Sequence, residues 1–151
     1  MYIKKVAVVG AGTMGADICY TIAMAGIPVV LRDVSREQLD HARQHIQELF
    51  QGRVARNKMS VGDVEDRMSF ITFSGDLHDL ESVTLAIEAV TEKLAVKKAV
   101  FRELDLVLPP SIHDSVQYLG VKHQSLGDSH IAAHARGRYA LLLSCSHDEI
   151  G

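Results

Sequence analysis

The stretch V-A-V-V-G-A-G-T-M-G-A-D-I, residues 6–18, decides the fold of this chain. Its first four residues form a continuous apolar run, which is typical of a strand buried on both faces of a parallel sheet. The run stops at Gly10, and apolar residues then recur at helical spacing over residues 14–25, until Gly26 supplies a helix stop. The order strand, glycine turn, helix is therefore encoded near the N-terminus.

The next elements complete a βαβ unit. A second buried strand is predicted over residues 28–31, and Asp33 stands where that strand ends. Ser35 and Gln38 have the spacing of a capping box and open a long helix. The apolar face of this helix comprises Leu39, Ala42, Ile46, Leu49 and Phe50.

Strands and helices keep alternating up to residue 110. Ser60 and Asp63 open a shorter helix, residues 69–73 and 85–89 have the pattern of strands, and residues 92–108 that of a helix ended by Pro109-Pro110. This alternation predicts an α/β fold with a doubly wound parallel sheet of the Rossmann type. The sheet is truncated, because residues 111–151 lack hydrophobic periodicity and are predicted to form an irregular tail.

The glycine turn has the spacing G-x-G-x-x-G between a strand and a helix. Gly10 permits the tight turn, Gly12 leaves room for a pyrophosphate, and Gly15 lets the helix pack close to the sheet. The N–H groups and the positive dipole end of the helix then face the phosphates. The predicted cofactor loop comprises Gly10, Ala11, Gly12, Thr13, Met14 and Gly15. The alternative is that these glycines serve only a turn.

Asp33 follows Gly15 by eighteen residues, at the position where a carboxylate can accept hydrogen bonds from the adenosine ribose. Its charge favours NAD as the cofactor, because a carboxylate repels the 2′-phosphate of NADP. Arg32 and Arg36 lie close by and argue in the opposite direction. A second alternative is that Asp33 only caps the helix near Ser35.

The composition narrows the class of partner. The chain has 151 residues, 47% of them hydrophobic and 23% charged, a net charge of -3 and a pI near 6.2. This charge balance gives no basic footprint for nucleic acid, and the sequence has no polybasic stretch for an anionic membrane surface. Cys19 and Cys145 form no metal-binding pattern or disulfide framework, and the first residues do not have the pattern of a signal peptide. We therefore expect a cytoplasmic protein with a small-molecule partner and no metal.

Residues 86–101, A-I-E-A-V-T-E-K-L-A-V-K-K-A-V-F, closely resemble the 3-hydroxyacyl-CoA dehydrogenases, and so does L-R-D-V at residues 31–34. The resemblance covers residues 3–110 and defines an NAD-binding domain over residues 1–110. It implies that Glu92 and Lys97 contact NAD, with Ala89 and Val90 lining the nicotinamide side. The alternatives are a carboxylate at a helix N-terminus for Glu92 and a solvated helix face for Lys97.

The resemblance also implies partners. A full-length protein of this family oxidises a 3-hydroxyacyl-CoA to a 3-ketoacyl-CoA and commonly forms a homodimer. It binds coenzyme A near the second helix, where Arg53, Arg56 and Lys58 stand here. We interpret these three residues as a solvated basic patch, with contact to the coenzyme A phosphates as the alternative. His41 and His45 have metal-compatible spacing, but with no third ligand in view we interpret them as a solvated face.

Residues 111–151 depart from the family. Family members continue with N-T-S, then with G-M-H-F-F, which carries the catalytic histidine, and then with P-x-M-K-L-V-E; none of these occurs here. No catalytic residue is therefore assigned. Read one nucleotide later, the codons allowed for residues 138–151 can encode G-M-H-F-F-S-P-A-P-M-M-K-L-V, and those for residues 117–124 can encode N-T-S-A-L-S-I-S. We hypothesise that one nucleotide was inserted close to the codons for Pro109 to Ile112.

Three functions follow from these patterns. The first is the NAD-binding part of a 3-hydroxyacyl-CoA dehydrogenase of fatty-acid or butanoate metabolism, inactive alone. The second is a non-enzymatic NAD-binding or regulatory module. The third is another dehydrogenase with this Rossmann variant, against which the Glu92 and Lys97 pattern argues.

Overall fold

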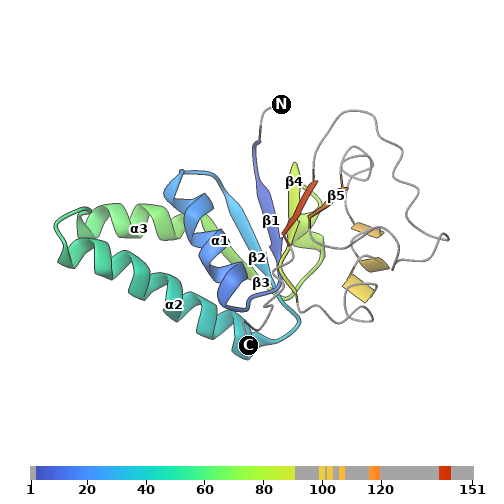
Figure 1. Cartoon of the computed structure of the whole chain (residues 1–151), viewed down its shortest axis with the longest axis horizontal. Coiled ribbons are helices and arrows are strands. Elements are labelled where there is room, and N and C mark those ends of the chain that lie inside the picture. The colour runs from blue at the N-terminus through green and yellow to red at the C-terminus, as the bar shows by residue number, and fades with distance from the viewer. Residues whose placement is uncertain are drawn as a thin grey trace, which may run out of the picture.

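A computed structural model describes residues 3–90, 99–100, 102–103, 106–107, 116–119 and 140–143. Four strands form one parallel sheet in the order β3-β2-β1-β4 (Figure 1). They are β1 (Val6–Val9), β2 (Val29–Arg32), β3 (Ile71–Ser74) and β4 (Leu85–Glu88). The chain passes outward from β1 through β2 to β3 and then returns to β4 on the other side of β1. The predicted doubly wound parallel sheet is confirmed, and its switch point lies between β1 and β4.

Three helices lie together on one face of this sheet (Figure 1). They are α1 (Thr13–Met24), α2 (Arg36–Ala55) and α3 (Val61–Ser69). Ser35 caps α2, since its hydroxyl accepts a hydrogen bond from the Gln38 N–H at 3.3 Å. Ser60 and Asp63 form a reciprocal capping box at the start of α3, and these hydrogen bonds lower the pKa of the exposed Asp63 carboxyl.

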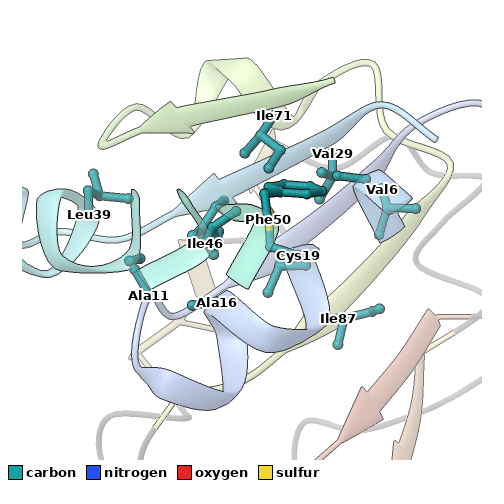
Figure 2. Packing of buried hydrophobic residues seen from close by; sticks show 14 residues of the cluster. Val6, Ala11, Ala16, Cys19, Val29, Leu39, Ile46, Phe50, Ile71 and Ile87 are labelled. Atoms are coloured by element: carbon teal, nitrogen blue, oxygen red, sulfur yellow. The ribbon is translucent and has the colours of Figure 1, made fainter. Parts of the chain in front are cut away.

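The main core fills the space between these helices and the sheet. Figure 2 shows Phe50 and Ile46 of α2 beside Cys19 of α1, over the strands. Phe50 also meets Tyr20 edge to face, with ring centroids 4.8 Å apart. Burial raises the pKa of the Cys19 thiol to about 12, so this cysteine is a protonated core residue at neutral pH. Of the apolar helix face predicted from the sequence, Leu39, Ala42, Ile46 and Phe50 are buried in this core, whereas Leu49 is half-buried.

The opposite face of the sheet carries a smaller core. Its buried members are Ala7, Val9, Val30, Leu80, Val83, Ala86 and Val100. The segment between β3 and β4, which includes the 3-10 helix η1 (His78–Leu80), supplies two of them. Val100 comes from the helical residues 99–100, 102–103 and 106–107 that follow β4. Both faces of the sheet are thus covered, as a parallel sheet requires.

Element boundaries differ slightly from those predicted. The second strand covers Val29–Arg32 instead of 28–31, and the third covers Ile71–Ser74 instead of 69–73, because Ser69 completes α3. The helix predicted over 92–108 is helical at the residues that the structure describes; Glu92 and Lys97 lie outside them. Within the described ranges, no helix combines the length and apolar character that a membrane crossing requires.

The sequence predicted no element after residue 110, but the structure describes two short strands there. They are β5 (Val116–Leu119) and β6 (Ala140–Leu143), which pair in parallel. β6 also lies beside β4. Its four residues form a continuous apolar run, which suits a strand even where the surrounding sequence has no periodicity.

Gly15→Ala is expected to disrupt the fold, because a Cβ at this position would lie 1.8 Å from the backbone oxygen of Gly10. We expect a loss of about 3 kcal/mol or more in the free energy of unfolding, measured by urea titration with circular dichroism. Gly52→Ala in α2 is the matched control, since a Cβ there meets nothing within 4 Å. It should stabilise the chain by about 0.5–1 kcal/mol. Equal stability of the two variants would contradict the packing argument.

Candidate functional site

The loop between β1 and α1 is held tightly by two strand ends. Gly10 adopts a φ of 108°, a left-handed conformation that favours glycine, and its N–H donates to the Arg32 carbonyl at 2.8 Å. A Cβ on Gly10 would lie 2.7 Å from the carbonyl oxygen of Ala89. The loop is therefore pressed between the carboxyl ends of β2 and β4, where ligands bind in open α/β sheets.

Gly12 differs from its neighbours because a Cβ there would meet nothing within 4 Å. Packing within the described protein therefore gives no reason for glycine at this position. Gly12 is also the N-cap residue of α1 and offers no side-chain hydrogen bond, whereas Ser35 and Ser60 cap α2 and α3. The first turn of α1 contains no acidic residue. An uncapped helix start beside an open glycine suits the approach of an anion.

The other predicted loop residues surround this opening. Ala11 is buried, Thr13 is exposed and Met14 is half-buried. Gly15 is buried against Gly10, and its N-terminal position in α1 brings the helix start onto the end of β1. The loop predicted from the sequence is thus one contiguous structural unit.

Asp33 ties this loop to the start of α2. Its Oδ2 accepts a hydrogen bond from the Ala11 N–H, and its Oδ1 accepts one from the Ser35 N–H, both at 2.8 Å. A carboxylate has about four acceptor sites, so these bonds leave capacity for further donors such as ribose hydroxyls. The helix-capping interpretation and the cofactor interpretation of Asp33 are therefore compatible.

The carboxyl end of β4 completes the wall on the other side of the loop. The Ala89 N–H donates to the Val9 carbonyl at 2.7 Å, and the Val90 N–H donates to Glu88 Oε1 at 2.7 Å. The structure thus brings Ala89 next to the glycine loop. The buried Glu88 was missed as a site residue, although it stands inside the I-E-A-V pattern. The positions of Glu92 and Lys97 fall outside the described residues.

The surroundings of Arg32 were also not evident from the sequence. Its guanidinium donates from Nη2 to Glu103 Oε2 at 3.1 Å, and its side chain is only 6% exposed. Glu103 belongs to the helical residues after β4 and lies 71 positions away in the sequence. Arg36, the other cation near Asp33, is exposed at the start of α2. Of the two arginines near Asp33, Arg32 is therefore buried and paired, whereas Arg36 is exposed.

The remaining candidates lie away from this loop. His45 contacts Asp17 of α1 at 2.8 Å, and no group of three or more potential metal ligands occurs among the described residues. Arg53 lies in the last turn of α2, Arg56 caps the end of this helix, and Lys58 follows. Because α2 rises about 1.5 Å per residue, they stand roughly 25 Å or more from its start beside Asp33.

Comparison with known proteins identifies a family and relatives that match the first three quarters of the chain. Residues 5–113 match the family described as 3-hydroxyacyl-CoA dehydrogenase, NAD binding domain. A 3-hydroxyadipyl-CoA dehydrogenase of Escherichia coli K12 is 40% identical over 108 residues, which cover 72% of this chain and 23% of that protein. A 3-hydroxybutyryl-CoA dehydrogenase of Mycobacterium tuberculosis is 36% identical over 106 residues, covering 70% of this chain and 37% of that protein.

Solved structures agree with these relatives. The crystal structure of 3-hydroxybutyryl-CoA dehydrogenase from Escherichia coli K12 aligns with a TM-score of 0.69 at 39% identity. The aligned region covers 74% of this chain and 24% of that one. The chain therefore spans only 23–37% of the length of the two curated relatives above.

Asp33→Asn is expected to destabilise the fold, because an amide has only one oxygen for the two backbone N–H donors that the carboxylate now serves. One donor is left facing the NH₂ group, at a cost of about 1–3 kcal/mol in the free energy of unfolding. Urea titration measures this loss.

Asp17→Asn is the matched control, since Asp17 forms one exposed contact with His45. Its effect should stay within about 0.5 kcal/mol. If the Asp33 variant were as stable as this control, Asp33 would not hold the loop.

Proposed function

The chain belongs to the 3-hydroxyacyl-CoA dehydrogenase family through its NAD-binding domain, and on this basis we propose that residues 1–110 bind NAD across the carboxyl ends of β1, β2 and β4. The domain would serve a full-length enzyme that oxidises a 3-hydroxyacyl-CoA to a 3-ketoacyl-CoA. Bound NAD would accept the hydride removed from the substrate. An acyl-CoA substrate, a homodimer and a cytoplasmic location of the full-length enzyme belong to the same proposal, and the acyl-CoA names of the relatives support the substrate class.

The observation that carries this proposal is the open space at Gly12 beside the uncapped start of α1. The pyrophosphate would lie there and accept hydrogen bonds from the first N–H groups of the helix. Asp33, one strand away, would accept hydrogen bonds from the adenosine ribose while keeping its contacts to Ala11 and Ser35. The space and the acceptor are both present in the protein without a ligand.

The remaining cofactor contacts follow from the resemblance. Ala89 and Val90 would line the nicotinamide side, which agrees with the contact between Ala89 and the glycine loop. Glu92 and Lys97 would contact the cofactor from the segment that follows β4. No residue of this chain is proposed as the general base, since residues 111–151 contain no G-M-H-F-F motif.

A non-enzymatic NAD-binding module is the second candidate. The missing histidine motif favours it, because NAD binding needs only the first 110 residues under this proposal. The two candidate functions differ in whether the gene also encodes the part of the enzyme that carries the catalytic histidine.

Gly12→Ala is expected to fold normally and to lose NAD binding. A Cβ at Gly12 has room in the free protein but occupies the space proposed for the pyrophosphate. Isothermal titration calorimetry of the 151-residue chain should give saturable NAD binding, weakened at least about tenfold by this substitution. The Gly52→Ala variant is the control and should bind as the wild type does. Equal affinity of the Gly12 variant and the wild type would contradict the proposed site.

The same preparation should show no reduction of acetoacetyl-CoA by NADH, followed by absorbance. Without a positioned general base, the chain lacks a group that enzymes of this type use for proton transfer. Turnover by the pure 151-residue chain would contradict the assignment of no catalytic residue.

We further propose that the tail, residues 111–151, is read out of frame. The family match ends at residue 113, close to the codons where the insertion was inferred. With a single shift by one nucleotide, the codons allowed at residues 117–124 and 138–151 permit two separate family motifs in the correct order. The histidines of the tail would then be products of the shifted frame rather than a metal-binding cluster.

Resequencing the DNA that encodes residues 105–115 tests this proposal. We expect one extra nucleotide, in the gene or in the original read, whose removal yields N-T-S and G-M-H-F-F in the downstream translation. Codons for residues 117–124 and 138–151 that cannot encode these motifs in the shifted frame would refute it.

A further inference from the structure

Arg32 carries a permanent positive charge on the strand that ends at the proposed cofactor site. It is the last residue of β2, its carbonyl accepts the Gly10 N–H, and Asp33 follows it directly. The Cα atoms of Arg32 and Asp33 are about 3.8 Å apart, so the Arg32 side chain starts directly beside the residue proposed to bind the ribose. An unpaired guanidinium there would attract the 2′-phosphate of NADP.

Glu103 neutralises this charge. The Arg32 residue is 5% exposed, and Glu103 Oε2 lies 3.1 Å from its Nη2. The guanidinium forms its ion pair with Glu103 through Nη2. Its Nε is buried and has no hydrogen-bond partner among the described residues. The Arg32 side chain is 6% exposed and the Glu103 side chain 42% exposed, so salt screens the guanidinium less than it screens the carboxylate that pairs with it.

Two neighbouring charges do not change this argument. Glu88 lies in the same row of the sheet, separated from Arg32 by Val9, and its carboxylate accepts the Val90 N–H. Arg36 is exposed and remains charged whichever residue occupies position 103. Both are present in every variant compared below.

We propose that Glu103 is a specificity-determining residue: by pairing with Arg32 it removes the attraction for a 2′-phosphate and leaves Asp33 to select NAD over NADP. This inference rests on the proposed NAD-binding function. It concerns the ratio of two affinities, which a purely structural role of the ion pair would leave unchanged.

The experiment measures NAD and NADP affinities by calorimetry at low ionic strength for four chains. They are the wild type, Glu103→Gln, Arg32→Leu, and the double variant Arg32→Leu/Glu103→Gln. Glu103→Gln frees the guanidinium charge and should raise NADP affinity relative to NAD about three- to tenfold. In the Arg32→Leu background the same substitution should raise the ratio less, because no buried cation is released and solvent screens the Glu103 carboxylate, which is 42% exposed.

Glu103→Asp keeps the carboxylate and should keep the wild-type ratio. Equal weakening of both affinities by Glu103→Gln would assign the pair a structural role only and overturn the inference, as would an unchanged ratio. If Glu103→Gln does not unfold cooperatively, the Arg32→Leu variant tests the inference instead. A rise in NADP affinity relative to NAD on loss of the arginine would overturn the inference. Absence of saturable NAD binding by the wild type would instead overturn the proposed function.

Discussion

The close approach of Gly15 to the carbonyl oxygen of Gly10 is the constraint on which the rest of the structure depends. It allows α1 to start directly against the end of β1, with no room for a side chain between them. The helix then lies across the sheet, where Cys19 and its neighbours meet Phe50 of α2. The same contact points the start of α1 at the carboxyl edge, so one packing requirement serves both the core and the opening at Gly12.

The end of β2 joins the parts of the site that the glycine contact brings together. Arg32 holds Gly10 through its carbonyl and Glu103 through its guanidinium, while Asp33 holds Ala11 and Ser35 through its carboxylate. Two consecutive residues therefore connect the loop, α2 and the segment after β4. A site built in this way is organised before a ligand arrives, which lowers the ordering cost of binding.

Local patterns predicted most of this arrangement. The apolar run at β1, the glycine spacing and the capping serines each act within a few residues, so the four strands, α1, α2 and α3 could be placed to within one or two positions. Glu103 could not be found in this way, because its partner Arg32 lies 71 positions away and the pair depends on how the crossover folds. β6 escaped prediction for a related reason, since its apolar run has no neighbouring periodicity.

The two faces of the sheet differ in the residues that they bury at the carboxyl edge. The face under α1 and α2 is apolar along its length, with Phe50 and Ile46 fully buried. The other face ends at the carboxyl edge in a row where Ser74, Arg32 and Glu88 are buried polar residues, interrupted by Val9. Buried polar groups cost free energy unless they are paired. The apolar core under α1 and α2 contributes the burial that offsets this cost, while the Arg32–Glu103 pair and the Val90 N–H bond to Glu88 satisfy part of the row directly.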